Sequence, residues 1–261
     1  MPYELGRRAR IAPLAAGVAL VLAAAGCGGS GGDSSTRKQT IDVVAPATLN
    51  AVLPALKSAF TQDDPGVTVR LDMGHSPAQV VQLKQGAPGS VFVTAGSMDM
   101  DKAESQGLLG GSPVTFARTE LEIVVPAGNP KHVKGLADLG KSGLTVVMPA
   151  ASMPVGGFAQ QALRKAKVTV RSASMEMGSP TVVQKVAGGN ADAGVVFVTD
   201  VKAGGSKVSG VRIPAADQVR APYLAAVLKK APSPDAAKRF VTFLRSAQAR
   251  KALGAQGFLP P

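Results

Sequence analysis

The stretch IDVVAPATLNAVLPALKSAFTQDDPGVTVRLDM, residues 41–73, decides the fold class of this chain. Residues 41–45 and 67–73 are short runs rich in β-branched side chains, which are typical of strands. Residues 50–61 between them carry apolar side chains at helical spacing. A strand, a helix and a second strand in this order form the unit that builds parallel sheets, so we predict an α/β fold.

The same alternation continues from this stretch to the C-terminus. We expect further strands at residues 90–94, 121–126, 144–148, 193–198, 208–213 and 223–228. We expect further helices at residues 77–85, 98–105, 156–166, 181–187, 234–244 and 247–253. This alternation indicates parallel sheets with helices on both faces. In such sheets ligands bind beyond the carboxyl ends of the strands, where the next helix begins.

The N-terminal segment predicts where the protein works. Residues 7–10 hold three arginines, residues 11–25 form an apolar run, and Cys27 follows the small residues Ala-Ala-Gly. This pattern is typical of a lipoprotein signal, so we predict a signal peptide over residues 1–27 with lipid on Cys27, followed by a flexible tether at 28–39. The protein would then be exported and anchored to the outer face of the cell membrane. A short buried or membrane helix with a chance cysteine, and export by a twin-arginine route, are the alternatives.

The composition limits the possible functions. Cys27 is the only cysteine, so no disulfide, thiolate metal site or cysteine nucleophile is expected in the exported part. The net charge of +12 favours an anionic partner or surface. Nucleic acid is the weakest candidate, because the chain has no Trp, only two Tyr, and no basic runs interleaved with aromatic residues.

Four of the expected strand-to-helix turns stand out, at residues 45–50, 73–77, 148–157 and 177–181. Each is small, polar or rich in Gly and Pro, and none contains a carboxylate, an arginine or a lysine. A helix start offers unpaired backbone N–H groups and partial positive charge. Four such starts in one cleft would hold a small, fully deprotonated oxyanion such as molybdate, tungstate or sulfate. A phosphate that keeps a proton would lack an acceptor for it, at a cost of ~1–3 kcal/mol.

Single residues in these turns also have simpler interpretations. Thr48 and Ser76 could each be only a helix cap, and Asp200 is expected to cap the turn that follows it. Two histidines, His75 and His132, make neither a metal site nor a convincing base. A membrane-tethered hydrolase is disfavoured because no Gly-x-Ser-x-Gly elbow lies between an expected strand and helix. We therefore expect a binding protein without enzymatic activity, metal or cofactor; a scaffold lipoprotein without a ligand would lack the cleft.

Several short segments follow one another in a specific order: ATLN (47–50), QGAP (85–88), VFVTA (91–95), AGNP (127–130), GLADL (135–139), PVG (154–156), GNADAGVVF (189–197) and Gly257-Phe258. In this order they resemble the substrate-binding lipoproteins of molybdate ABC transporters, over residues 41–261. The resemblance implies a type II periplasmic binding protein fold, in which two α/β lobes are joined by two hinge crossings and enclose a ligand cleft. It places lobe 1 at residues 40–120 and 217–261 and lobe 2 at 121–216, with crossings near 119–125 and 214–223.

The resemblance also implies a set of ligand-binding residues: Thr48, Ser76, Val155, Ser179 and Phe197. Val155 and Ser179 would each contribute a backbone N–H, and Phe197 stands where the family has a tyrosine whose hydroxyl reaches the anion. The implied function is capture of molybdate, with tungstate as a second ligand, by a monomer that delivers the anion to an ABC permease. Binding of sulfate or another tetrahedral oxyanion by the same fold is the alternative.

Overall fold

The computed structural model describes residues 38–261. By its internal contacts, the segment Thr36–Pro261 is one compact unit. The expected signal peptide with Cys27, and the expected tether up to residue 37, lie outside the described residues. Gln39, placed in the tether by the sequence, is the first residue of a strand.

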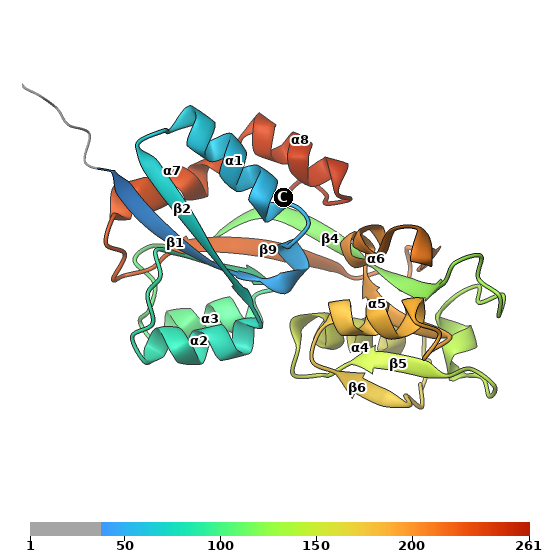
Figure 1. Ribbon diagram of the computed structural model, residues 1–261. Helices are drawn as coiled ribbons and strands as arrows, with labels where there is room; N and C mark the ends of the chain where they lie inside the picture. Colours follow the sequence, from blue (N-terminus) through green and yellow to red (C-terminus); the bar gives the residue numbers. More distant parts are fainter. Residues whose placement is uncertain (1–37) are drawn as a thin grey trace, which may run out of the picture. The chain divides into compact units, whose positions relative to one another are not determined.

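The described residues form one mixed nine-stranded sheet (Figure 1). Its order is β2-β1-β3-β9-β4-β7-β5-β6, with β8 paired to β4. The strands are β1 (Gln39–Pro46), β2 (Val67–Gly74), β3 (Val91–Ala95), β4 (Val114–Pro126), β5 (Val146–Pro149), β6 (Ser174–Glu176), β7 (Ala193–Phe197), β8 (Val208–Arg212) and β9 (Arg220–Val227). Parallel pairing is confined to β2-β1-β3 at one end and β7-β5-β6 at the other, while β4 and β9 pair only antiparallel.

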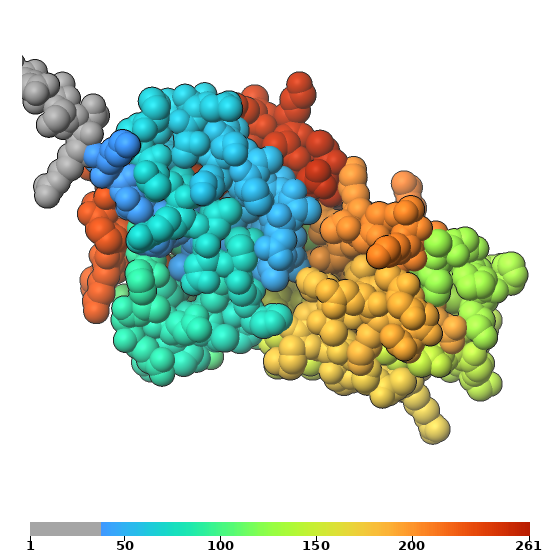
Figure 2. Space-filling model, viewed as in Figure 1, coloured from blue at the N-terminus to red at the C-terminus, as the bar shows by residue number. Residues whose placement is uncertain are grey.

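Helices cover these two parallel groups separately. Helices α1 (Leu53–Asp63), α2 (Ser76–Lys84), α3 (Met98–Ser105), α7 (Pro234–Phe243) and α8 (Ala247–Ala255) surround β2-β1-β3, which we call lobe 1. Helices α4 (Pro154–Lys165), α5 (Ser179–Ala187) and α6 (Val198–Gly204) surround β7-β5-β6, which we call lobe 2. Short 3-10 helices lie at η1 (Ala47–Leu49), η2 (Leu136–Gly140) and η3 (Gly205–Lys207). In Figure 2 the blue and teal surface of lobe 1 meets the yellow and orange surface of lobe 2 along a seam.

Several boundaries differ from those expected, for identifiable reasons. The helix expected at 50–61 begins only at Leu53, because Ala47–Leu49 first forms a 3-10 turn. The helix expected at 181–187 begins at Ser179, because Pro180 has the fixed φ angle that suits a first helical turn. The strand expected at 193–198 ends at Phe197, where α6 starts directly, and this short helix was not expected.

The two lobes are joined by β4 and β9. Residues 114–120 of β4 pair with β9, and residues 121–126 pair with β7 and β8, so the pairing changes partner between Glu120 and Leu121. The exact lobe limits given by the sequence stay a prediction, but the strand that carries the first crossing is continuous through this point.

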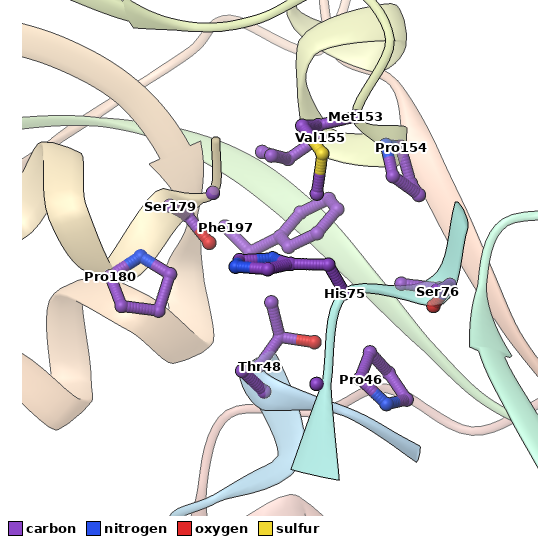
Figure 3. Close-up of a pocket in the computed structure, with 14 residues that line it drawn as sticks. Pro46, Thr48, His75, Ser76, Met153, Pro154, Val155, Ser179, Pro180 and Phe197 are labelled. Atoms are coloured by element: carbon purple, nitrogen blue, oxygen red, sulfur yellow. The ribbon is translucent and has the colours of Figure 1, made fainter. Parts of the chain in front are cut away.

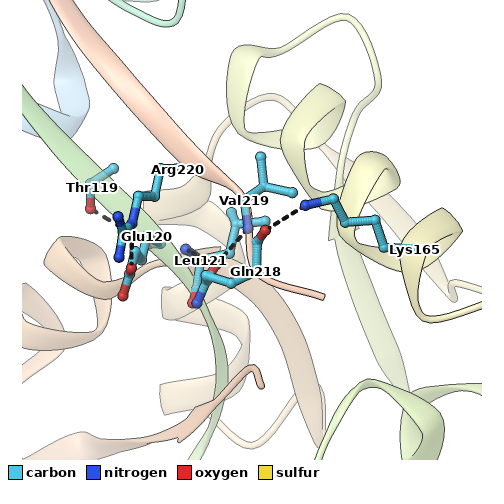
Figure 4. Close-up of polar contacts among 7 residues, drawn as sticks. All are labelled: Thr119, Glu120, Leu121, Lys165, Gln218, Val219 and Arg220. Atoms are coloured by element: carbon cyan, nitrogen blue, oxygen red, sulfur yellow. Dashed lines mark hydrogen bonds and ion pairs between the residues drawn. The ribbon is translucent and has the colours of Figure 1, made fainter. Parts of the chain in front are cut away.

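The return crossing is held to β4 by polar contacts (Figure 4). The Gln218 side chain donates to the Leu121 carbonyl and accepts from the Leu121 N–H, both at 3.0 Å. Lys165 of lobe 2 donates to the Gln218 carbonyl at 2.8 Å, and Arg220 pairs with Glu120 at 2.9 Å. These bonds bind the two crossing segments to each other at the point where β4 changes partner.

Candidate functional site

A small pocket of about 30 Å³ lies between the lobes at the carboxyl ends of the parallel strands (Figure 3). Lobe 1 lines it with the ends of β1, β2 and β3 and the starts of η1 and α2; lobe 2 lines it with the end of β7 and the starts of α4 and α5. This is the position at which open α/β sheets bind ligands. Because a single water needs about 10–15 Å³ of such space, the pocket suits a solute of few atoms and not a sugar or a peptide.

The structure brings all five residues expected to bind the ligand into this one pocket: Thr48, Ser76, Val155, Ser179 and Phe197. They are separated by up to about 150 positions in the chain and come from both lobes. The pocket also has lining residues that the sequence did not single out as ligands, among them Pro46, Ala95, Met153 and Pro154.

Backbone donors in the pocket come from the first turns of three helices. Ser76 is the first residue of α2, Ser179 the first of α5, and Val155 the second of α4. The N–H groups of a first helical turn have no carbonyl partner within the helix. In all three helices a proline occupies the first or second position, which removes one N–H and leaves its neighbours as the donors.

The hydroxyls of Ser76 and Ser179 are buried polar groups of the pocket that lack a hydrogen-bond partner within the described part of the chain. The two side chains are 2% and 0% exposed, and neither hydroxyl oxygen has a hydrogen-bond partner among residues 38–261. Leaving a buried hydroxyl unpaired costs ~1–3 kcal/mol. One of these hydroxyls belongs to lobe 1 and the other to lobe 2, so a ligand that pairs with both must bridge the lobes.

The interpretation of Thr48 and Ser76 as helix caps is wrong. His75 occupies the N-cap position of α2, and its side chain makes no capping hydrogen bond. Ser76 is the first residue of the helix itself. No side chain caps η1, and the Thr48 oxygen accepts a hydrogen bond from the Tyr223 hydroxyl at 2.9 Å. The Tyr223 contact had no signal in the sequence, because the two residues are 175 positions apart.

Asp200 lies just behind the pocket. Its carboxylate accepts the Phe197 N–H at 3.1 Å, so it caps the start of its own helix α6 and not the turn that follows it. Burial raises the pKa of Asp200 to about 6, an effect that the nearby Ser179 hydroxyl and the Phe197 N–H partly offset. The Ser179 hydroxyl is close enough to influence this carboxyl, but their geometry falls short of a hydrogen bond.

Phe197 and His75 shape the rest of the pocket. The Phe197 ring is fully buried and brings no polar atom. The exposed His75 ring lies across the pocket in Figure 3, close to Gly178 of lobe 2, where an added Cβ would be 3.3 Å from the imidazole Cε1. No lysine, arginine or carboxylate from the described part of the chain lines the pocket, which leaves hydroxyls, helix starts and one imidazole as its polar groups.

No cluster of three or more His, Cys, Asp or Glu between residues 38 and 261 could hold a metal ion. In the same segment, no helix combines the length and apolar character needed to cross a membrane.

A two-lobed α/β fold with a small pocket between its lobes is typical of solute-binding proteins. Residues 41–259 match the sequence profile of the family described as bacterial extracellular solute-binding protein, and the chain belongs to this family. It is 35% identical to the molybdate-binding protein ModA of Mycobacterium tuberculosis over 247 residues, which cover 93% of this chain and 95% of that protein. The resemblance to molybdate-binding proteins drawn from the sequence is thereby confirmed.

Solved structures agree on the fold. The periplasmic molybdate-binding protein of Azotobacter vinelandii superposes with a TM-score of 0.70 at 22% identity, covering 85% of this chain and 99% of that one. The sulfate-binding protein SubI of Mycobacterium tuberculosis superposes with a TM-score of 0.74 at 21% identity, covering 85% and 87%. The expected type II periplasmic binding protein fold is confirmed.

Proposed function

We propose that this protein captures molybdate between its lobes, with tungstate as a second ligand, and delivers it to an ABC permease. The observation that carries this proposal is the pair of buried, unpaired hydroxyls of Ser76 and Ser179, which line one small pocket from opposite lobes. An anion that accepts from both hydroxyls binds the closed arrangement of the lobes better than an open one. Ligand binding therefore shifts the protein toward the closed form, which is the form a permease can recognise.

The charge pattern of the pocket favours a dianion without protons. Helix starts and hydroxyls donate hydrogen bonds, and fixed dipoles hold negative charge without a salt bridge. No carboxylate lines the described pocket to accept a proton from the ligand. A tetrahedral oxyanion that is fully deprotonated near neutral pH meets these conditions, and a protonated phosphate does not.

Sulfate is the second candidate, and Phe197 favours it. Phe197 offers no hydroxyl at the position where molybdate-binding relatives are expected to have one, so the pocket has one donor fewer. The 35% identity to ModA over most of both chains supports molybdate, whereas the likeness to SubI, at 21% identity, supports only a shared fold. Molybdate is therefore the first choice.

The remaining features of the proposal rest on the sequence. We infer a monomer whose Cys27 carries a lipid that holds it at the outer face of the cell membrane, with no nucleic-acid partner, no cofactor and no enzymatic activity. Mass spectrometry of the membrane-extracted protein should find a lipid-modified N-terminal cysteine. Cys27→Ser should release the protein from the membrane, and a variant that stays bound would contradict the anchor.

The ligand assignment is tested by titrating residues 36–261 with oxyanions in a calorimeter. We expect molybdate and tungstate to bind tightly and to raise the melting temperature, sulfate to bind more weakly, and phosphate not to bind. Sulfate that displaces molybdate at equal concentration would favour the second candidate. No heat and no melting shift with millimolar molybdate or tungstate would overturn the proposal.

A further inference from the structure

Tyr223 is a buried tyrosine of the hinge whose hydroxyl is hydrogen-bonded to Thr48, a residue that lines the ligand pocket. Tyr223 belongs to β9, is 0% exposed, and donates to the Thr48 oxygen at 2.9 Å. Its backbone is paired with Ala95 of β3 on one side and Ala117 of β4 on the other. The Tyr223 backbone is therefore held between β3 and β4, and its hydroxyl reaches Thr48 on the pocket wall.

Aromatic rings hold the Tyr223 side chain in one orientation. The Phe258 ring lies edge-on at 5.1 Å between centroids, and the Phe116 and Phe197 rings lie edge-on at 6.3 Å. Phe197 is the pocket residue that lacks the family's hydroxyl, so the nearest phenol to that position belongs to Tyr223. Burial raises the pKa of Tyr223 and the Asp200 carboxylate raises it further, while the hydrogen bond with Thr48 lowers it; the net shift is upward, so the phenol keeps its proton.

The direction of this hydrogen bond matters for Thr48. A threonine hydroxyl has one hydrogen and two lone pairs. When the Tyr223 hydroxyl donates, its hydrogen occupies one lone pair of the Thr48 oxygen, and the Thr48 hydrogen is free to point away from Tyr223. Thr48 lies on the pocket wall, and its side chain points toward the pocket in Figure 3. A ligand oxygen there is the acceptor that the Thr48 hydrogen can reach.

We propose that Tyr223 is a positioning residue that turns Thr48 into a donor toward the bound oxyanion, in place of the hydroxyl that Phe197 lacks. This inference rests on the proposed function, because it concerns the same anion site. It predicts that Tyr223→Phe weakens molybdate binding about fivefold, although the Tyr223 side chain lines no part of the pocket. Thr48→Val should weaken binding at least as much. The double variant should bind no more weakly than Thr48→Val alone, because Tyr223 acts through Thr48.

The experiment compares calorimetric affinities of residues 36–261 in the wild type, the two single variants and the double variant. Ser90→Ala is the matched control: the Ser90 hydroxyl is buried and accepts the Asp42 N–H at 3.1 Å, away from the pocket. This control should lower the melting temperature and keep the molybdate affinity. Wild-type affinity in Tyr223→Phe, or full additivity in the double variant, would overturn the inference while the proposed function stands. A wild-type protein that binds no molybdate would instead overturn the proposed function.

A second measurement needs no Tyr223 variant. The chain has no Trp, and its two tyrosines are Tyr3 and Tyr223, so tyrosine fluorescence of residues 36–261 reports on Tyr223 alone. Molybdate should change this emission in the wild type and in Ser90→Ala, and should leave it unchanged in Thr48→Val. An emission that does not respond in the wild type, or that responds equally in Thr48→Val, would contradict the coupling.

Discussion

Gly96, directly after β3 in lobe 1, lies against the ring of Phe158 on α4 in lobe 2. A Cβ on Gly96 would be 2.9 Å from the Phe158 Cε2, closer than real side chains approach. The residue also has a φ of +89°, in the left-handed region where glycine is favoured. Its N–H donates to the Pro222 carbonyl at 2.7 Å, which ties it to the hinge strand. The lobes thus meet beside the pocket at a position that only glycine fits.

Gly96→Ala should therefore hinder closure. We expect molybdate affinity to fall about tenfold, because the new methyl group both strains the backbone and pushes Phe158 away. Gly107→Ala separates these effects, since Gly107 also has a positive φ of +68° but nothing within 4 Å of an added Cβ. It should lose stability and keep its affinity. Equal affinities in the two variants, measured by calorimetry, would contradict a role for this contact in closure.

Each of the variants Ser76→Ala and Ser179→Ala should keep the stability of the ligand-free protein and lose molybdate affinity. Ser76→Ala removes a buried hydroxyl that has no partner, so the ligand-free protein should melt at the same or a higher temperature, whereas Ser179→Ala also removes a hydroxyl that favours the Asp200 carboxylate and should leave the melting temperature about unchanged. Each also removes a donor to the anion, so molybdate affinity should fall about tenfold. Thermal unfolding and calorimetry on the same samples test both effects. A variant that loses stability and keeps its affinity would show that its hydroxyl is structural.

The backbone donor at Val155 can be tested through its neighbour. A Cβ on Gly156 would be 2.0 Å from the Ala150 carbonyl oxygen, so Gly156→Ala must displace the first turn of α4 and with it the Val155 N–H. We expect at least a tenfold loss of molybdate affinity. Gly157→Ala is the control, because its Cβ would meet only the Met98 Cε at 3.9 Å. If both variants bind like the wild type, the start of α4 is not a ligand contact.

The sequence could predict the strand-to-helix turns of the site because each is local. Ser76, Val155 and Ser179 follow strands in their own segments, and a strand followed by a proline-started helix is recognisable without long-range information. The fold class followed from the same alternation. The sequence could not show that β4 and β9 insert antiparallel strands between two parallel groups, since strand pairing is decided by packing between distant segments.

Contacts between distant segments were also missed. Tyr223 and Thr48 are joined by a side-chain hydrogen bond across 175 positions, and nothing near either residue announces it. Gly96 and Phe158 meet only because the lobes approach each other there. Asp200 was expected to cap the turn that follows it, and that expectation gave no hint that its carboxyl would be buried and hydrogen-bonded to the Phe197 N–H.

The buried Asp200 carboxyl should make stability depend on pH in an unusual direction. Burial raises its pKa in the folded protein to about 6, above the ordinary value of 3.8, so the folded state binds this proton more readily than the unfolded state. The group therefore destabilises the protein above pH 6, and this cost disappears as the pH falls from about 6 toward 4. Asp200→Asn, whose side-chain oxygen can still accept the Phe197 N–H, should be more stable than the wild type at pH 7.5, by up to ~3 kcal/mol. The difference should vanish near pH 4 in ligand-free urea unfolding.

Asp138→Asn serves as a comparison variant, because its effect on stability at pH 7.5 should have the opposite sign to that of Asp200→Asn. Hydrogen bonds from the Lys141 side chain and the Lys134 N–H hold the pKa of the half-buried Asp138 below its usual value. Asp138→Asn should therefore lose stability at pH 7.5, and the loss should shrink as the pH falls through the native pKa of that carboxyl. An Asp200→Asn curve that runs parallel to the wild type from pH 4 to pH 7.5 would show that the Asp200 carboxyl titrates as it does in the unfolded chain.

A buried carboxylate beside the pocket also repels the anion, so wild-type molybdate affinity should rise from pH 7.5 to pH 5.5, and this rise should be lost in Asp200→Asn.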